Sequence, residues 1–598
     1  MVVNIDTICK KLVDFFLLFV IIIKIKNLLE VRQMYKNLKE NYPLYEVREI
    51  SSLRELVDTG AELYGDRPAF KYKNKGEVIS VSYKQFKEDV DAYGTALCEM
   101  GLDGKHIGII GDNSYNWVRS YLTVLNSSGV VVPIDKELSA EEVKNILITG
   151  DCEVLIYSGG ATESKIKEIE PELTDITHFI CMSELTAKDD KHFYIEDIIE
   201  KGRQLLKNGD SRYTSLIPDN KVLKELLFTS GTTGKSKGVM LSAECLVFNI
   251  INGQKLMNIT DTCLSVLPYH HSYESTTGIL VMLHAGMTIC INESLRSVLP
   301  NFKLYKPTEV LLVPLFVEKV YRGIWDKAEE SGKAAMLRKL IKVSNSLRRI
   351  GIDVRSKLFT SVTSVFGGRL KAIICGGAPL KPQLVEFFES IGITLINGYG
   401  ISECGPLISI NRPCYRNSES VGILLPEMEL KIDNPNEDGE GEICVKGANV
   451  MLGYYKNEKA TAEAIVDGWF HTGDVGKTEG DFIYITGRIK NIIILKNGKN
   501  IYPEEIEEKL SVMSDLIAEI VVKSIRDGED DERYLGAEIF PDFDRAKQLG
   551  IEDAEAEIRK TISEYNEKEA GYKVIKKIIF RKEEFEKTTT KKIKRKYN

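Results

Sequence analysis

The chain has 598 residues, of which 43% are hydrophobic and 28% are charged, the balance of an ordinary globular protein. This length exceeds what one hydrophobic core supports, so at least two domains are expected. The composition excludes a disordered chain, a collagen and a many-helix membrane protein, and a formal net charge of −8 argues against general nucleic-acid binding. The eleven cysteines form no CxxC pair, which indicates thiols in a reducing cytoplasm and neither a disulfide framework nor a zinc site.

An apolar run near the amino terminus, LVDFFLLFVIII at 12–23, is flanked by lysines. As a helix it would span roughly 18 Å, less than the ~30 Å hydrocarbon core of a bilayer. Three interpretations stay open: a helix in peripheral contact with a membrane, an export signal, or upstream sequence read from a wrong start, with Met34 as the true beginning. Residues 1–33 are therefore taken as a separate apolar segment.

Strands and helices are predicted to alternate in the long amino-terminal part. HIGII at 106–110, a helix at 114–125 and VVVPI at 130–134 make a strand–helix–strand unit of the length that a parallel pair needs. The pattern returns at 371–396, where an apolar run precedes a helix with apolar residues at helical spacing. This alternation predicts a layered α/β architecture.

The residue pattern changes twice towards the carboxyl end. From about Gly422 it becomes short strands split by glycines, typical of a small β-barrel or meander. After Gly487 about a hundred charged residues follow, the size of a small domain. We therefore predict a large domain at 34–487, with two layered α/β sheets and a small β-barrel, and a small α+β domain at 488–598.

The strongest local signal is the segment LFTSGTTGKSKG at 227–238. Its threonines, serines, glycines and two lysines offer hydroxyls, accessible backbone N–H groups and ammonium donors, which suit a polyphosphate. It is not a Walker A loop, because two residues separate Gly231 from Gly234 where that pattern needs four. A kinase or motor built on that loop is therefore disfavoured.

Five motifs occur in order along the chain: TSGTTGKSKG, NGYGISE at 397–403, GWFHTGD at 468–474, GRIKNIIILKNGKNIYPEEIE at 487–507 and KTTTKKIKR at 587–595. Together they make the chain resemble the adenylate-forming (AMP-binding) superfamily of acyl-CoA synthetases, luciferases and peptide-synthetase adenylation domains. Within it, the bacterial long-chain fatty acid–CoA ligases are most similar. The resemblance implies that the small carboxy-terminal domain is mobile.

The resemblance also implies a nucleotide site. Glycines after apolar strands let the backbone approach a ligand at the carboxyl ends of an α/β sheet, where Tyr399 would stack on adenine. An ordinary packed tyrosine is the alternative. Asp474 would accept both ribose hydroxyls, and Arg488 would contact the same nucleotide. The residues expected to bind ATP and AMP are Thr229, Ser230, Gly231, Thr232, Thr233, Gly234, Lys235, Gly376, Gly377, Ala378, Asn397, Gly398, Tyr399, Gly400, Ser402, Asp474 and Arg488.

Three residues carry the catalytic expectations of the resemblance. Lys592 would neutralise the charge that develops when a carboxylate attacks the α-phosphorus, with Lys591, where glycine is usual, as the alternative. Glu403, together with Thr233, would hold Mg²⁺ through hard oxygen ligands; a plain surface glutamate is the alternative. His271, in LPYHHSYE, would border the acyl carboxylate and the thiol tunnel, unless it is simply packed.

The implied reaction is an ATP-dependent ligation of an acid to a thiol. A medium- or long-chain fatty acid would form an acyl-adenylate and pass to coenzyme A while the small domain turns about a hinge at Lys490. ATP, Mg²⁺ and coenzyme A are the expected cofactors, and the protein is expected in the cytoplasm or at the inner face of the membrane. Two alternatives stay open: transfer to an acyl-carrier protein, and an inactive membrane scaffold with the same fold. A covalent nucleotidyl ligase would need a Lys-x-Asp-Gly nucleophile, which the chain lacks.

Overall fold

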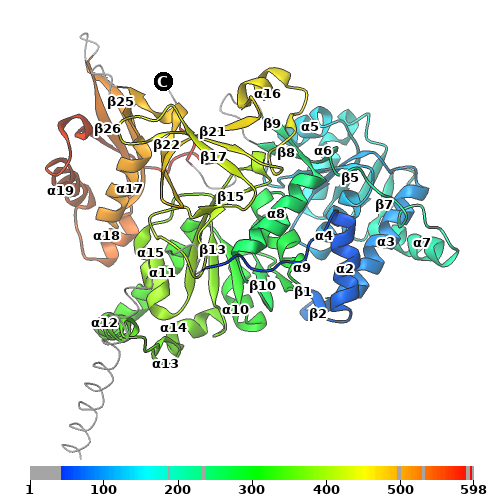
Figure 1. The fold of residues 1–598 in the computed structure, drawn as a ribbon, viewed down its shortest axis with the longest axis horizontal. Helices are drawn as coiled ribbons and strands as arrows, with labels where there is room; N and C mark the ends of the chain where they lie inside the picture. The colour runs from blue at the N-terminus through cyan, green and yellow to red at the C-terminus, as the bar shows by residue number, and fades with distance from the viewer. Residues whose placement is uncertain are drawn as a thin grey trace, which may run out of the picture.

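The computed structural model describes residues 42–185, 189–229, 236–494, 500–527, 532–587 and 593–595. In Figure 1 they form three regions, with the amino-terminal helices and strands on the right, a long sheet in the centre and the carboxy-terminal elements on the left. The apolar run at 12–23, the loop residues Ser230–Lys235 and Lys592 lie outside the described residues. Among the described helices, none is long and apolar enough to cross a membrane.

The first region is an eight-stranded sheet with the order β19-β9-β8-β4-β3-β5-β6-β7. The predicted strand–helix–strand unit is confirmed, because β3 and β4 pair in parallel and α4 connects them, beginning where the Ser114 side chain accepts the N–H of Trp117. The strands are β3 His106–Ile110, β4 Val130–Ile134, β5 Cys152–Tyr157, β6 His178–Cys181, β7 His192–Tyr194, β8 Leu223–Thr229, β9 Lys237–Ser242 and β19 Gly453–Tyr454. The helices are α2 Leu53–Tyr64, α3 Tyr83–Glu99, α4 Tyr115–Leu125, α5 Ala140–Thr149, α6 Ala161–Ile169 and α7 Ile195–Lys207.

The second region is a fourteen-stranded sheet whose centre is parallel. Its parallel part and amino-terminal edge consist of β1 Pro68–Asn74, β2 Glu77–Ser82, β10 Thr262–Ser265, β11 Thr288–Ile291, β12 Glu309–Leu312, β13 Ala372–Cys375 and β14 Thr394–Gly400. The helices beside it are α8 Ala243–Leu256, α9 Met282–His284, α10 Val298–Tyr305, α11 Pro314–Glu330, α12 Ala334–Arg349, α13 Arg355–Leu358, α14 Thr360–Thr363 and α15 Pro382–Ile391. The predicted strand, helix and strand at 371–396 are therefore confirmed as β13, α15 and β14.

The predicted small β-barrel is instead an open antiparallel continuation of this sheet. Its strands are β15 Leu407–Ile410, β16 Ile423–Leu424, β17 Glu429–Asp433, β18 Gly441–Lys446, β20 Ile465–Val466, β21 Trp469–Glu479 and β22 Phe482–Arg488, with α16 Glu458–Ala464 beside them. They join the parallel part through the antiparallel pair β14–β15, and β17 ends the pairing order. Glycine-split strands predict antiparallel turns, but closure depends on whether the end strands pair, which the local pattern does not encode.

A π-helix, η2 Tyr273–Val281, packs against α8 between the two sheets. Glu274 at its start is fully buried and accepts a hydrogen bond from the Ser265 hydroxyl at 2.6 Å. π-helices are rare and often occur at functional sites. This one begins within the LPYHHSYE segment, two residues after His271, the predicted acyl-site residue.

The carboxy-terminal region has a hydrophobic core of its own, made only of residues from Ile493 onwards. Its elements are β23 Ile493–Ile494, β24 Asn500–Ile501, α17 Pro503–Met513, β25 Ile517–Asp527, β26 Glu532–Pro541, α18 Phe543–Gln548, α19 Ala554–Asn566 and β27 Ile575–Phe580. Two ion pairs join α18 and its N-cap to α11, Arg322–Asp542 at 2.9 Å and Arg545–Asp326 at 2.8 Å. A separate core with polar contacts to its neighbour is what a small α+β unit requires.

Candidate active site

The site forms where the parallel strands β13 and β14 end. Because the two strands pair in register, with Cys375 opposite Asn397, their carboxyl ends bring the loop at 376–378 beside the turn at 398–400. A side chain at Gly400 would meet the Pro406 carbonyl oxygen at 2.1 Å, so only glycine fits where β15 crosses back. Two motifs that lie twenty residues apart in the sequence thus line one surface.

Asp474 is the centre of a polar cluster at this surface. Its carboxylate is 3% exposed, accepts a hydrogen bond from the Tyr399 hydroxyl at 2.7 Å and pairs with the Arg488 Nε at 2.7 Å. Burial, followed by the charge of Asp474, raises the pKa of the Tyr399 phenol well above its ordinary value, so Tyr399 stays a donor. β21 and β22 set this geometry because they pair Asp474 directly with Arg488.

A second set of contacts fixes the Asp474 turn, the bulge within β21 where Gly473 has a φ of 70°. Glu442 on β18 accepts the Gly473 N–H at 3.0 Å and hydrogen-bonds the His471 Nδ1 at 2.7 Å, while the Thr472 hydroxyl accepts the Asp474 N–H at 3.1 Å. Cys444 lies beside this group, and burial raises the pKa of its thiol to about 12, so without a bound metal it stays a neutral thiol. Sequence reasoning missed Glu442, because only strand pairing reveals that β18 supports the turn.

Glu403 lies next to the ends of the phosphate-loop hairpin. Its Oε1 accepts a hydrogen bond from the Tyr454 hydroxyl at 2.9 Å, and the Lys237 ammonium lies 4.7 Å from the centre of the Tyr454 ring. Thr229 and Lys237 are paired at the ends of β8 and β9, so the chain leaves and re-enters the sheet beside this carboxylate. Carboxylate oxygens suit Mg²⁺, and the position next to the loop ends fits such a role. No sequence pattern pointed to Tyr454, which the pairing of β19 with β9 brings here.

An apolar cavity of about 70 Å³ opens beside the nucleotide-site residues. Gly376, Gly377 and Gly398 to Gly400 line it together with His271, Ser402 and the side chains of Met257, Val281 and Met282. The His271 Nδ1 accepts the Tyr273 N–H at 3.1 Å, so a neutral ring carries its proton on Nε2. The Ser272 and Ser402 hydroxyls are 3.4 Å apart and join the acyl-site segment to the NGYGISE turn.

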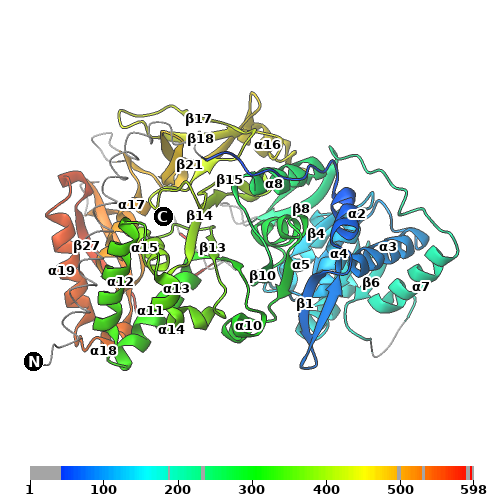
Figure 2. The same ribbon diagram turned by 60° about the horizontal axis from the view of Figure 1, so that its bottom comes forward.

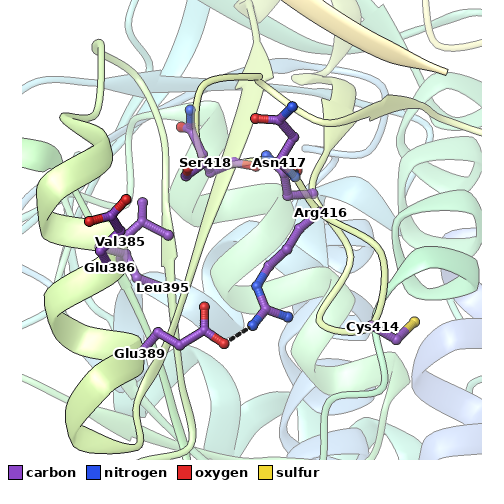
Figure 3. A pocket seen from close by; sticks show the side chains of 10 residues that line it. Val385, Glu386, Glu389, Leu395, Cys414, Arg416, Asn417 and Ser418 are labelled. Carbon is purple, nitrogen blue, oxygen red and sulfur yellow. Dashed lines mark hydrogen bonds and ion pairs between the residues drawn. The ribbon is translucent and has the colours of Figure 1, made fainter. Parts of the chain in front are cut away.

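Besides Asp474 and Arg488, the predicted nucleotide residues Asn397, Ala378 and Thr229 do not line this cavity. Asn397 is buried, and its side-chain amide donates to the Ser420 carbonyl at 3.3 Å. It lines a second, larger cavity of about 370 Å³ between α15 and the segment at 411–418, which the Arg416–Glu389 ion pair crosses (Figure 3). Ala378 is exposed in its loop, and Thr229 contacts the Lys237 carbonyl at 3.5 Å.

The carboxy-terminal tail and the expected hinge lie near the Asp474 cluster. Arg595 pairs with Glu507 and lies 3.6 Å from Glu504, whose other contact is with Asn491 beside Lys490. Lys490 is exposed, but partial desolvation, followed by the nearby Arg488 charge, lowers the pKa of its ammonium. Arg595, three residues after Lys592, is thus connected through Glu504 to Asn491, which follows the strand that carries Arg488.

Comparison with known proteins agrees with this geometry. The family model for AMP-binding enzymes matches residues 57–455. A long-chain-fatty-acid–CoA ligase, ACSBG2, of Homo sapiens is 30% identical over 488 residues, covering 76% of this chain and 72% of the relative. The long-chain-fatty-acid–CoA ligase FadD15 of Mycobacterium bovis is 29% identical over 509 residues, with 81% of each chain covered.

Solved structures share the fold. A crystal structure of the anthranilate CoA ligase AuaEII in complex with anthranoyl-AMP superposes with a TM-score of 0.71 at 18% identity, covering 93% of this chain and 97% of that one. A Mycobacterium tuberculosis fatty acyl CoA synthetase gives a TM-score of 0.62 at 19% identity, with 91% and 96% covered. Since the family model covers well over half of the chain, this protein belongs to the AMP-binding enzyme family, with its mixed α/β adenylate-forming fold.

Proposed function

We propose that this chain is an AMP-forming acid–thiol ligase that activates a medium- or long-chain fatty acid as an acyl-adenylate and transfers it to coenzyme A. The observation that carries the proposal is the meeting of the Asp474 cluster, with Tyr399 and Arg488, and an apolar cavity that His271 borders. One surface thus offers partners for a ribose, an adenine and an acyl chain. The similarity to relatives named as long-chain fatty acid–CoA ligases supports the choice of acid.

The nucleotide half of the site follows from the donors and acceptors present. A ribose can give both of its hydroxyl protons to the buried Asp474 carboxylate, since Tyr399 and Arg488 already hold that carboxylate in place. Adenine would lie along Tyr399 and the glycines at 376–377. Ionised acceptors make hydrogen bonds about twice as strong as neutral ones, so Asp474 would dominate ribose binding.

The phosphates would lie between the 227–238 loop and Glu403. Glu403 and Thr233 would hold Mg²⁺, which supplies positive charge to the phosphate oxygens when it is bound. Tyr454 donates to Glu403 and would fix the direction of its carboxylate. Lys592, three residues before Arg595, would add its ammonium charge as the acid attacks the α-phosphorus and pyrophosphate leaves.

The acyl chain would enter the cavity that His271 borders. At about 70 Å³ the cavity is much smaller than the ~300–1,000 Å³ of typical ligand pockets, so side chains must move when an acid binds. Met257 and Met282 are the flexible members of its lining, and unbranched methionine side chains adapt readily. The apolar lining favours a hydrocarbon chain over a charged or sugar-like acid.

We further propose that the small domain, 488–598, turns on the large domain, 34–487, about Lys490. Its separate core and the polar contacts of α18 with α11 support this division. A cytoplasmic location is supported by the free thiols of all ten cysteines in the described ranges. Transfer to an acyl-carrier protein remains the second candidate acceptor reaction, since it uses the same adenylation site.

Pyrophosphate release over a panel of straight-chain acids from two to eighteen carbons tests the proposal. We expect release to rise with chain length, and a thioester to form when coenzyme A is added. The variant Asp474→Asn is the matched control and should reduce release with every acid. If a thioester forms with acyl-carrier protein but not with coenzyme A, acyl-carrier protein is the acceptor. If no acid causes pyrophosphate release, the chain is an inactive scaffold.

A further inference from the structure

The charge of this chain is unevenly distributed. Residues 333–371 contain ten Lys and Arg and a single acidic residue, Asp353, a net charge of +9 within a chain whose net charge is −8. The segment comprises α12, α13 and α14 and ends one residue before β13. Such an excess of one sign in an otherwise acidic protein indicates a binding surface for an anionic partner.

The basic residues lie along one edge of the molecule. Figure 1 shows α10, α12, α13 and α14 in a row along the lower edge, and the same row is seen when that edge is turned forward in Figure 2. This edge is formed by the amino ends of β10, β12 and β13, whereas the nucleotide-site residues follow the carboxyl end of β13. The surface therefore lies away from the candidate active site. We call it the basic edge.

Many of these charges have no internal partner. Arg338, Arg348, Arg355 and Arg369 pair with carboxylates of the protein. By contrast, no carboxylate in the described part of the chain lies within ion-pair distance of four exposed residues, which are Lys339, Lys342, Arg349 and Lys357. Unpaired cations on one surface attract anions at long range.

Exposed apolar side chains stand among these cations. On α12, Met336 is 60% exposed and Val343 is 43% exposed, and they share the outward face of the helix with Lys339 and Lys342. The opposite face, which includes Leu337, packs on the body of the protein. On α10, Leu299 and Leu304 are also exposed, together with Lys303 and with Lys306 at its C-cap. The basic edge is thus both cationic and apolar.

We propose that the basic edge binds the surface of a bilayer that contains anionic lipids. Clusters of four to eight lysines and arginines are attracted to anionic head groups, and apolar side chains among them insert at the boundary of the acyl chains. The charges are spread over several helices, which fits many separate head groups better than one ligand. This contact is separate from the apolar run at 12–23 and does not depend on the proposed reaction.

Co-sedimentation of the full chain with large vesicles tests the proposal. The protein is expected to bind vesicles of phosphatidylcholine with one-third phosphatidylglycerol, but not phosphatidylcholine alone, and to be released at high salt. Replacing Lys339, Lys342 and Arg349 with Gln should weaken the partition coefficient by about 100-fold, since each basic residue near an anionic surface contributes about fivefold. Pyrophosphate release by this triple variant should be unchanged, because the basic edge lies away from the active site.

A control variant removes the same charge from surfaces outside the basic edge. Lys201 and Lys207 are exposed on α7, and Lys221 is exposed two residues before β8. Their replacement with Gln should leave vesicle binding unchanged. Three outcomes would overturn the proposal. The two variants could weaken vesicle binding equally, the basic-edge variant could still bind vesicles at high salt, or the natural chain could bind neutral and anionic vesicles equally. Binding of purified acyl-carrier protein that only the basic-edge variant loses, with vesicle binding intact, would assign the edge to an acidic protein instead.

Discussion

Glu274 at the start of the π-helix should make the stability of the large domain depend on pH. Its carboxyl group is fully buried, one oxygen accepts from the Ser265 hydroxyl, and the other has no hydrogen-bond partner among the described residues. Burial raises the pKa of Glu274 to about 8, and the Ser265 contact only partly offsets this. In the folded protein at neutral pH, the group is therefore mostly protonated, whereas in the unfolded chain it is ionised.

The sign of the effect follows from proton linkage. The folded-state pKa is above the unfolded value, so this stability contribution is complete below about pH 4.5 and is lost as pH rises towards 8. The slope approaches 1.4 kcal/mol per pH unit within that window. The variant Glu274→Gln has nearly the same shape and no charge to lose. Its advantage over the natural chain should therefore grow by about 2 kcal/mol between pH 6 and pH 8.5.

Thermal unfolding at the two pH values measures this difference. The melting temperature of Glu274→Gln relative to the natural chain should rise by a few degrees on going from pH 6 to pH 8.5. Glu244→Gln, an exposed glutamate on the neighbouring α8, is the control and should show no such change. If Glu274→Gln and the natural chain differ in melting temperature by the same amount at both pH values, the reasoning is refuted. That result would mean that the carboxyl group is ionised in the folded protein.

The other predictions concern the proposed reaction. Asp474→Asn should lower kcat/KM for ATP about 100-fold in pyrophosphate release, since two hydrogen bonds to an ionised group are lost at about 1.5 kcal/mol each. Glu442→Gln should raise KM for ATP about tenfold with little change in kcat, because it loosens the turn of Asp474 without touching substrate. Lys592→Ala should slow adenylate formation by about 10²–10³ and spare thioester formation from supplied acyl-adenylate. If both steps slow equally, the catalytic role would pass to Lys591, and Lys591→Ala is the control variant. The variant Lys490→Pro has φ fixed near −65°, so it should form adenylate but fail to transfer the acyl group in single-turnover assays. If the variant keeps both steps, the domain does not rotate about this residue.

Local pattern was enough to predict the parallel strands and the outline of the site. Two apolar runs with a helix-like segment between them predicted the bounds of β3, α4 and β4 to within one residue. This was possible because buried parallel strands need continuous apolar segments. The glycine motifs at the ends of β13 and β14 and the HTGD motif could be recognised in the sequence for a similar reason. Each must bring backbone close to a ligand, and that requirement leaves glycines in the sequence.

Contacts between distant strands could not be predicted in this way. Tyr454 reaches Glu403 only because β19 pairs with β9, and Glu442 supports the Asp474 turn only because β18 pairs with β21. Neither pairing has a signature in the residues themselves. For the same reason, an open sheet was taken for a small barrel. The π-helix was also missed, because YESTTGILV has no period that separates it from an ordinary buried helix.

The contacts of the small domain explain how it could turn on the large one at little cost. In the described residues, Arg322–Asp542 and Arg545–Asp326 join α11 to α18 and its N-cap, and the carboxylates of both pairs are partly exposed. Such pairs are worth about 0–1 kcal/mol each, because water replaces the partner when they open. The Asp474–Arg488 pair, by contrast, has a buried carboxylate, and Arg488 precedes Lys490 by two residues, so the pair lies on the large-domain side of the proposed hinge residue. A rotation that begins at Lys490 would therefore break the weak pairs and keep the nucleotide cluster intact, so that the adenylate could stay bound while the small domain changes position.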